Sequence, residues 1–276
     1  MKSIVITGSS SGIGKASAKL FAANGWKVAA TMRTPKNETE LSKLDNVSLY
    51  QLDVTDDQSV ASAVEQIITD LGTVDVVMNN AGIGYMGPFE TSKPEQVRQQ
   101  FETNVFGLMN VTRAFLPHFR SNKAGLFINV SSIGGVVTFP LLSLYISSKW
   151  AVEGFTESLL FELTPFNIQV KLIEPGAVVT EFSATSIALS QNKQIEDYAE
   201  MSANYIKMIG KTGLELSTAE YLAEGIFKAA TDNKKQLRYF LGPDAERIYA
   251  ARKTLGDEAF VKDMAEKTIS SLSSSI

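Results

Sequence analysis

Residues 3–21 read SIVITGSSSGIGKASAKLF, and this stretch decides the fold. Its first five residues are mostly apolar and β-branched, which predicts a short buried strand over Ser3–Thr7. Three glycines follow in the spacing Gly-x3-Gly-x-Gly, and apolar residues at helical spacing begin directly after them. Such a turn lets the backbone approach a pyrophosphate, whose charge the free N–H groups of the helix N-terminus stabilise. We therefore expect a dinucleotide-binding turn made by Gly8, Ser10, Ser11, Gly12, Ile13 and Gly14.

The rest of the chain alternates short apolar runs with longer amphipathic stretches. Further strands are predicted at Lys27–Thr31, Val47–Leu52, Val74–Asn79, Gly125–Val130, Ile168–Glu174 and Leu237–Leu241. Helices are predicted at about Ile13–Asn24, Asp56–Leu71, Pro94–Phe119 and Tyr145–Leu163. Strands that alternate with helices form βαβ units, so we expect an α/β fold. It is a Rossmann-type doubly wound parallel sheet of about seven strands with helices on both faces, in a single domain over residues 1–276.

The composition narrows the classes of function. The 276 residues carry a net charge of −4 with scattered basic residues, so no nucleic-acid or membrane partner is expected. The absence of cysteine and the single histidine, His118, exclude a thiolate zinc site and a cysteine nucleophile, and no metal is expected. We interpret His118 as a helix-end residue without a catalytic part. The sequence shows no apolar run long enough for a membrane span and no targeting segment, so a cytoplasmic location is expected.

The end of the second predicted strand bears on the choice of cofactor. Enzymes that use NAD usually carry an acidic residue there, which binds the ribose 2′-hydroxyl. This chain reads Ala30-Thr31-Met32-Arg33 instead, so no carboxylate repels a 2′-phosphate and Arg33 is available to bind one. We therefore expect NADP(H) rather than NAD(H). The alternative is that Arg33 is only a solvated loop cation.

Several further motifs lie at expected strand ends and on expected helices. Together with the glycine turn they are Thr7-Gly8-x3-Gly12-x-Gly14, Asp53, Asn79-Asn80-Ala81-Gly82, Asn104, Ser132, Tyr145-x3-Lys149 and Pro175-Gly176 with Thr180. The set resembles the short-chain dehydrogenase/reductase family, in its branch of single-domain oxidoreductases, over residues 1 to about 180. The resemblance implies hydride transfer between nicotinamide and an alcohol/carbonyl pair.

The pair Tyr145 and Lys149 suits the proton transfer that such a reaction needs. Lys149 lies four residues after Tyr145, on the same helix face, and its charge stabilises the phenolate of a group whose ordinary pKa is about 10. Ser132 would bond the substrate oxygen. A second copy of the pattern, Tyr249-x3-Lys253, has no serine at the matching position before it. We interpret Tyr249 as a surface helix residue.

The resemblance implies the remaining roles. Asn104 would hold a water that connects Lys149 to solvent, and Tyr145 and Lys149 would also contact the nicotinamide ribose. The other cofactor contacts implied are Asp53 and Val54 at the adenine, Asn80, Ala81 and Gly82 at the adenine ribose, and Pro175, Gly176, Val178 and Thr180 around the nicotinamide. Without the resemblance, a serine at a strand end is usually a cap, and Asp53 is a turn residue.

The regular alternation ends after Thr180. From there to about Lys211 apolar residues recur at helical spacing, namely Ile195, Tyr198, Met201, Tyr205 and Met208. We predict that residues 180–211 form a lid over a hydrophobic substrate. The alternative is a helix that packs this stripe on its own core. Residues 243–276 are predicted to add two short charged helices and a serine-rich end.

These observations favour one function and leave alternatives open. The first is an NADP(H)-dependent alcohol dehydrogenase or carbonyl reductase for a hydrophobic ketone, aldehyde or secondary alcohol. The second is a non-catalytic dinucleotide-binding redox sensor, which needs the glycine turn but not the set Asn104, Ser132, Tyr145 and Lys149. A sugar-nucleotide epimerase or dehydratase is disfavoured, because those families carry the spacing Gly-x-Gly-x2-Gly and a longer C-terminal domain. We expect a homodimer or homotetramer.

Overall fold

The structure is a computed structural model that describes residues 1–178, 195–211 and 216–268. Within these ranges seven strands run parallel in one sheet, in the order β3-β2-β1-β4-β5-β6-β7. They are β1 (Ser3–Thr7), β2 (Lys27–Met32), β3 (Val47–Gln51), β4 (Val76–Asn79), β5 (Gly125–Val130), β6 (Ile168–Pro175) and β7 (Arg238–Leu241). This sheet confirms the expected doubly wound fold, and every predicted strand overlaps an observed one.

The strand order reverses beside β1, and this reversal determines where a ligand binds. The chain runs outward from β1 through β2 to β3 and then returns to place β4 on the other side of β1. In open α/β sheets, ligands bind at such a switch point, in the crevice outside the carboxyl ends of the strands. Thr7 ends β1 and Asn79 ends β4, so these two residues flank the crevice.

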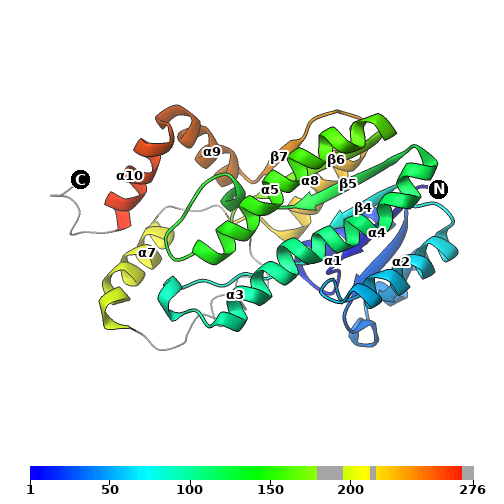
Figure 1. Ribbon diagram of the computed structural model, residues 1–276, viewed down its shortest axis with the longest axis horizontal. Coiled ribbons are helices and arrows are strands. Elements are labelled where there is room, and N and C mark those ends of the chain that lie inside the picture. Colours follow the sequence, from blue (N-terminus) through cyan, green and yellow to red (C-terminus); the bar gives the residue numbers. More distant parts are fainter. Residues whose placement is uncertain (179–194, 212–215, 269–276) are drawn as a thin grey trace.

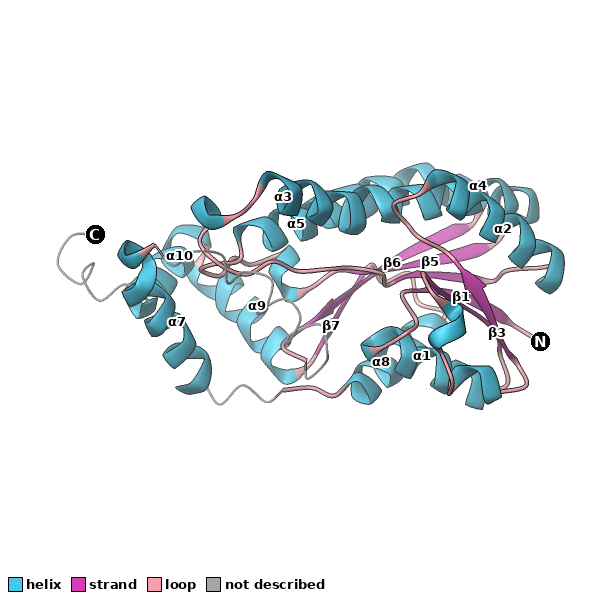
Figure 2. Cartoon of the chain, turned by 90° about the horizontal axis from the view of Figure 1, so that it is seen from below, coloured by secondary structure: helices cyan, strands magenta, loops and turns pink. Residues whose placement is uncertain are grey.

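Helices cover both faces of the sheet, as Figure 2 shows. On one face lie α1 (Gly12–Ala23) and α8 (Ala219–Thr231), and on the other α2 (Asp57–Leu71), α4 (Gly107–Asn122) and α5 (Ser143–Leu163). Alternate residues of β1 supply the two cores, since Ile4 and Ile6 pack with α1 and α8 while Val5 packs with α2 and α4. A strand buried on both faces explains the unbroken apolar run. None of the helices in the described ranges combines the length and apolarity that crossing a bilayer requires.

The helix expected over Pro94–Phe119 is present but is not α-helical throughout. Its first part is α3 (Pro94–Phe101), a π-helical turn occupies Glu102–Phe106, and α4 follows. At the junction, a Cβ on Gly107 would lie 2.6 Å from Cγ2 of Val54, so glycine permits α4 to approach the end of β3. A π-turn inserts one extra residue and is frequent at functional sites. The predicted helix is therefore confirmed, but the π-turn within it was not predicted, because hydrophobic spacing does not register one added residue.

The sequence analysis predicts no helix where α8 lies. Gly225 stands in the middle of α8, where glycine weakens a helical pattern, but a Cβ there would lie 2.7 Å from the methyl groups of Leu241. The glycine therefore lets α8 pack on β7 without displacing the side chain of Leu241. Lys171 of β6 is only 2% exposed and donates to Asp232, directly after α8, at 2.7 Å. A buried ion pair thus fastens the helix that carries the chain from β6 to β7.

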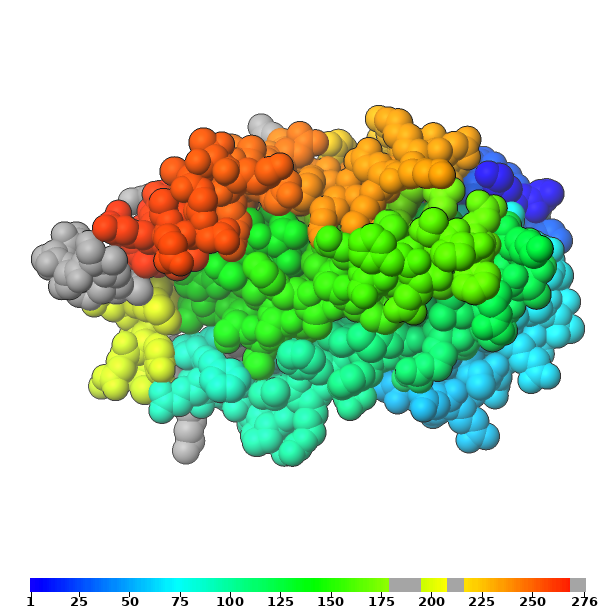
Figure 3. Space-filling model, turned by 45° about the horizontal axis from the view of Figure 1, so that its top comes forward, coloured from blue at the N-terminus to red at the C-terminus, as the bar shows by residue number. Residues whose placement is uncertain are grey.

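Three more helices gather at one end of the molecule. They are α7 (Ala199–Lys211), α9 (Pro243–Leu255) and α10 (Asp257–Thr268). Helix α10 lies beside α7 (Figure 1), and Figure 3 shows α9 and α10 alongside the start of α5. Phe260 of α10 is buried with Ile133 and Val137, which follow β5. The two helices expected after residue 243 are present, and they pack at the carboxyl end of the sheet.

Part of the predicted lid lies outside the described residues. This holds for residues 179–194 and for the side chain of Met208. In the described part of the stripe, Tyr205 is 4% exposed and burial raises its pKa to about 12. Tyr198 is half-buried, and its hydroxyl donates to Glu90 in the connection after β4 at 2.9 Å. The stripe therefore belongs to the core at Tyr205 and contacts a neighbouring loop at Tyr198.

Candidate active site

Thr7 and Asn80 hold the glycine turn against the end of β4. The Thr7 hydroxyl accepts hydrogen bonds from the N–H groups of Asn80 and Ala81 at 2.9 and 3.0 Å. Asn80 Nδ2 donates in return to the carbonyls of Thr7 and Gly8 at 2.9 and 3.1 Å. Gly8 has a φ of +68°, and a Cβ there would lie 2.9 Å from Cα of Ala81, so glycine is required. The structure thus brings the predicted turn and the Asn80–Ala81 segment together.

The first turn of α1 is open to an anion. Ser11 is the N-cap residue, its side chain makes no capping hydrogen bond, and the first turn carries no acidic residue. Gly14 leaves room for the tight turn, because a Cβ there would lie 2.4 Å from the carbonyl oxygen of Gly8. Ser10 is exposed and Ile13 is half-buried at the crevice. This backbone cradle fits the pyrophosphate of a dinucleotide.

The ends of β2 and β3 extend the same edge of the sheet. Thr31 pairs with the last residue of β1, so Arg33, two residues later, stands beyond the strand ends, where it is exposed. Asp53 follows β3, and its Oδ1 accepts from the N–H and the hydroxyl of Thr55 at 3.0 and 2.8 Å. Val54 is buried. Asp53 therefore forms a turn and at the same time lies on the predicted adenine side of the crevice.

α5 presents a row of side chains to the end of β5. Lys149 is 6% exposed and its Nζ donates to the carbonyl of Val130 at 2.9 Å. The same ammonium lies 5.7 Å from the centre of the Tyr145 ring. Tyr145 hydrogen-bonds Ser132, whose Oγ also accepts from the N–H of Gly134 at 3.0 Å. The structure therefore assembles Ser132, Tyr145 and Lys149 in one place.

Burial shifts the ionisation of both groups in this row. It lowers the pKa of Lys149 to about 8, while the charge of Glu153 acts to raise it. It raises the pKa of Tyr145 above its usual value, while the hydrogen bond with Ser132 acts to lower it. The Tyr145 phenol therefore keeps its proton at neutral pH. A protonated phenol is the form that donates to the oxygen of a carbonyl.

Asn104 lies in the π-helical turn and connects three segments. Its Oδ1 accepts from the N–H of Ile83, and its Nδ2 donates to the carbonyl of Ile83, both at 2.9 Å. Nδ2 also donates to Oγ of Ser148 at 3.1 Å. A Cβ on Gly82 would lie 3.3 Å from Oδ1 of Asn104. Asn104 therefore holds the strand end that carries Asn80 to Gly82 against α5, one residue before Lys149.

The loop after β6 is fixed from the C-terminal part of the chain. Asp244, in the first turn of α9 and 2% exposed, accepts from the N–H of Ala177 at 2.7 Å. A Cβ on Gly176 would lie 2.0 Å from Oδ1 of Asp244, so this position has room only for glycine. Val178 forms an isolated bridge just after this loop, and Thr180 lies outside the described residues. The predicted nicotinamide loop is thus held by α9.

The sequence analysis missed three residues that support the site. Gln100 of α3 is fully buried, accepts from the N–H of Tyr85 at 3.0 Å and donates to the carbonyl of Ile83 at 2.8 Å. Ser148 receives the hydrogen bond of Asn104, and Asp244 holds the loop after β6. Ser148 falls inside the Tyr-x3-Lys motif, which was a signal for it. The other two are ordinary polar helix residues in the sequence.

Two residues that the sequence analysis set aside lie away from this row. His118 Nε2 accepts from the N–H of Val74 at 3.1 Å, at the amino end of β4 and thus at the opposite edge of the sheet, and burial lowers its pKa. Tyr249 is half-buried in α9, and its ring stacks on Phe240 with centroids 4.1 Å apart. The interpretation of Tyr249 as a surface residue was therefore wrong in part, because one face of its ring packs against β7.

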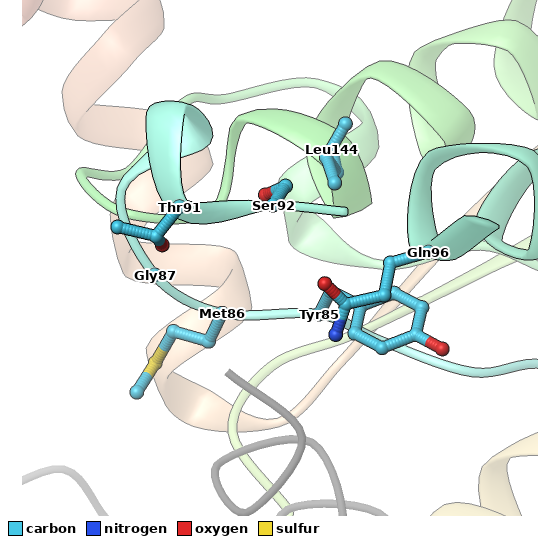
Figure 4. Close-up of a pocket in the computed structure, with 7 residues that line it drawn as sticks. All are labelled: Tyr85, Met86, Gly87, Thr91, Ser92, Gln96 and Leu144. Carbon is cyan, nitrogen blue, oxygen red and sulfur yellow. The ribbon is translucent and has the colours of Figure 1, made fainter. Parts of the chain in front are cut away.

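A small hollow adjoins the start of α5, as Figure 4 shows. It is lined by Tyr85, Met86, Gly87, Thr91, Ser92, Gln96 and Leu144. Its volume of about 10 Å³ is close to what one water molecule requires. Leu144 precedes Tyr145, so the hollow lies near the row on α5, but it is too small to contain a substrate.

Comparison with known proteins gives one family. The family model for short chain dehydrogenases matches residues 2–189. A 3-ketodihydrosphingosine reductase of Bacteroides thetaiotaomicron is 38% identical over 251 residues, which cover 91% of each chain. An NADPH-dependent 3-dehydrocapnine reductase of Ornithobacterium rhinotracheale is 33% identical over 283 residues, or 97% of this chain and 99% of that one.

Solved structures agree with this result. ElxO with NADP bound matches with a TM-score of 0.74 at 29% identity, covering 89% of this chain and 99% of that chain. A 3-ketoacyl-(acyl-carrier-protein) reductase from Brucella melitensis in complex with NADH matches with a TM-score of 0.72 at 28% identity, covering 87% of this chain and 96% of that chain. The family match covers most of the chain, including the glycine turn and the row on α5. The protein is an oxidoreductase of the short-chain dehydrogenase/reductase family.

Proposed function

We propose that the protein is an NADP(H)-dependent reductase of hydrophobic ketones. In the reverse direction it oxidises the corresponding secondary alcohols. The observation that carries the proposal is the row on α5, where Tyr145 and Lys149 face Ser132 at the end of β5. A redox sensor has no use for a buried lysine beside a phenol that still carries its proton. Proton donation beside a dinucleotide cradle is the requirement of carbonyl reduction.

In this proposal each residue of the row has one task. NADPH, when bound, supplies the hydride. Ser132 donates a hydrogen bond to the carbonyl oxygen and orients it, and Tyr145 gives its phenolic proton to that oxygen. The Lys149 ammonium then stabilises the phenolate that remains, from the 5.7 Å position seen here. Asn104, through Ser148, keeps the loop after β4 against α5, so that the crevice retains its shape.

The cradle fits the cofactor on grounds of space and charge. Gly8 and Gly14 lie where any side chain would clash, which brings the backbone close to a pyrophosphate. Arg33 is exposed beyond the end of β2, and no acid takes the position that binds a ribose 2′-hydroxyl. The relative from Ornithobacterium rhinotracheale is named NADPH-dependent. These observations support NADP(H) over NAD(H) for this chain.

The proposed substrate is a ketone with a long alkyl chain. Two relatives reduce 3-ketodihydrosphingosine and 3-dehydrocapnine according to their names, and 3-ketodihydrosphingosine is such a ketone. In this chain α7 lies beside α10, and Met201 of its stripe is only half-buried, a flexible side chain that adapts to an alkyl chain. We propose that the segment from about 180 to 211 covers the substrate and excludes water from the hydride path.

We also propose a homodimer or homotetramer in the cytoplasm. Phe106, Trp150 and Phe161 are large apolar residues near or on α4 and α5, exposed to 48%, 43% and 70%. Apolar side chains gathered on one side of a protein favour contact with a second copy. Sedimentation or light scattering of the purified protein measures its mass directly.

A panel of carbonyl compounds tests the proposal. We expect NADPH oxidation with 3-ketodihydrosphingosine and with long-chain 3-ketones, a rate that falls as the alkyl chain is shortened, and little turnover with NADH. The rates are measured from the absorbance of NADPH, at equal substrate concentrations below the critical micelle concentration of each ketone. Turnover of sugars or polyols alone, or equal rates with NADH, would contradict the proposal.

A further inference from the structure

α5 carries a third polar residue behind the pair Tyr145 and Lys149. Tyr145, Lys149 and Glu153 are each four residues apart and therefore share one helix face. Glu153 is 5% exposed. A Cβ built on Gly135 would lie 2.5 Å from Oγ of Ser131 and 2.8 Å from Oε1 of Glu153, so these two groups lie together beneath Gly135. The three successive turns of α5 thus face Ser132, the carbonyl of Val130 and Ser131, at the end of β5.

A salt-bridge cluster holds Glu153 from the side of the sheet. Arg238 of β7 bonds Glu153 through Nη1, and the same nitrogen donates to Glu174 of β6 at 2.9 Å. Its Nη2 donates to Glu157 of α5 at 2.7 Å. The side chains of Glu153 and Glu174 are 6% and 0% exposed, whereas that of Glu157 is 56% exposed. Two buried carboxyl groups therefore share one guanidinium.

The titratable groups around Glu153 come from three elements. They are Lys149 and Glu157 on α5, Glu174 on β6 and Arg238 on β7. Burial, helped by the charge of Glu153 and opposed by Arg238, raises the pKa of Glu174 to about 8, so Glu174 keeps its proton at neutral pH. Burial also raises the pKa of Glu153, but Ser131, Arg238 and Lys149 oppose that shift. Glu153 has two cations nearby, Lys149 and Arg238, whereas Glu174 bonds Arg238 alone, so the cluster favours the negative charge on Glu153.

We propose that Glu153 is a positioning residue of the active site: fixed by Arg238 one helix turn behind Lys149, its negative charge keeps Lys149 protonated to higher pH and directly sets the pH range in which Tyr145 transfers a proton. The inference rests on the proposed oxidoreductase function but not on the identity of the substrate. Lys149 donates to a neutral carbonyl at Val130, which holds an ammonium only weakly. Glu153 supplies the opposite charge that a buried ammonium requires.

The substitution Glu153→Gln tests this role, because it keeps the shape of the side chain and removes its charge. Loss of a negative charge lowers the pKa of each cation and acid nearby, so Lys149 and Tyr145 both titrate at lower pH. We expect the alkaline limb of kcat/KM for ketone reduction and the acid limb for alcohol oxidation to move down together by about one pH unit. A purely structural role lowers the rates and leaves both limbs in place.

Glu157→Gln is the matched control, since it removes an exposed charge that bonds the same Arg238. Its pH profile should stay within a few tenths of a unit of the wild type, because solvent screens an exposed charge. Glu153→Asp retains the charge and should restore the limbs even where its maximal rate is reduced. A folded Glu153→Gln protein with unmoved limbs, or a Glu157→Gln protein with the same shift, overturns the proposal.

A measurement without turnover separates this proposal from the proposed function. Ultraviolet titration of tyrosinate, taken as the difference between each protein and its Tyr145→Phe counterpart, reports the ionisation of Tyr145 alone. Tyr145 should ionise at lower pH in Glu153→Gln than in the wild type, whichever ketone is the substrate. The same titration curve in both proteins overturns the role of Glu153, whereas a shifted curve in a protein that reduces no ketone sets aside the proposed function only.

Discussion

Two tyrosines of the chain precede a lysine by four positions, and only their surroundings distinguish them. Tyr145 faces the hydroxyl of Ser132 at a strand end, with the ammonium of Lys149 at 5.7 Å. Tyr249 also has its lysine close, with Nζ of Lys253 at 5.5 Å from its ring, but it stacks on the ring of Phe240. Proximity of the lysine is therefore common to both. In the proposed reaction, the hydroxyl of Ser132 is therefore the feature that distinguishes Tyr145 as the proton donor.

The substitution Tyr145→Phe should reduce kcat for ketone reduction by at least about 100-fold, because no other described group at the site donates a proton to the oxygen. Binding of NADPH should change little, since the cradle at Gly8 and Gly14 is untouched. Steady-state rates and fluorescence titration of NADPH measure the two effects. Tyr249→Phe is the control and should keep full activity. Retention of more than a few per cent of the rate in Tyr145→Phe would reject the assignment.

Arg33→Asp should reverse the preference between NADPH and NADH. A charge-assisted contact with a 2′-phosphate contributes roughly 2 kcal/mol, which corresponds to about a thirtyfold rise in KM for NADPH when it is lost. The new carboxylate is also placed to accept from a ribose 2′-hydroxyl, which lowers KM for NADH. Lys36→Asp, at another exposed position of the same connection, serves as control for the change in net charge. An unaltered ratio of kcat/KM for the two cofactors in Arg33→Asp would show that Arg33 is a loop cation.

Among the elements, α8 depends on a charge pair for its place against β6. Burial acts to raise the pKa of Asp232, but hydrogen bonds from Lys171, the N–H of Lys234 and Tyr239 outweigh it and lower that pKa from 3.8 to about 2. A lowered folded-state pKa contributes stability above the unfolded value, and this contribution is lost as the pH falls from about 4 to about 2. The ion pair between Lys171 and Asp232 therefore contributes its full stability at neutral pH, and it loses this contribution in acid as Asp232 is protonated.

Asp232→Asn should cost about 3 kcal/mol of unfolding free energy at neutral pH, because it leaves Lys171 buried and charged. Urea unfolding at neutral pH and near pH 3 measures the effect, and the difference between wild type and variant should shrink in acid. The double variant Lys171→Met with Asp232→Asn should recover most of the loss, since it removes the unpaired charge. A difference that is the same at both pH values would show that the ionised pair contributes nothing.

The elements differ in how far their sequence predicts them. The inner strands were predictable because they are apolar runs buried on both faces, as the alternation of Ile4, Val5 and Ile6 between two cores shows. α8 was missed because Gly225 interrupts its pattern, and the reason for that glycine is its contact with Leu241 of β7. A parallel crossover from β6 to β7 requires such a helix, so topology carried the information that local sequence did not.

At the scale of the whole molecule, the parts of the site that depend on neighbouring residues can be predicted from the sequence, and those that depend on contacts between distant elements cannot. The glycine turn and the pair Tyr145 and Lys149 are each encoded within a few residues. Their spacing in the sequence is therefore enough to predict them. Glu153 looks like any acidic residue on a helix surface until β7 brings Arg238 to it. Asp244 likewise gains its role from the loop after β6. Which carboxylates are buried is decided by strand order, and one sequence does not state that order.

Arg238 belongs to the last strand, and this has a consequence for the nascent chain on a ribosome. The nucleotide cradle and six of the seven strands are complete once Pro175 has been added. At translation speeds of roughly 5–20 residues per second, about 3–13 s pass before Arg238 is made. Throughout that interval Glu153 and Glu174 lack the guanidinium that they share in the folded protein, so the salt bridge that joins α5 to β7 has not yet formed. A growing chain therefore completes its cofactor cradle early and forms the salt bridge between Arg238 and Glu153 last.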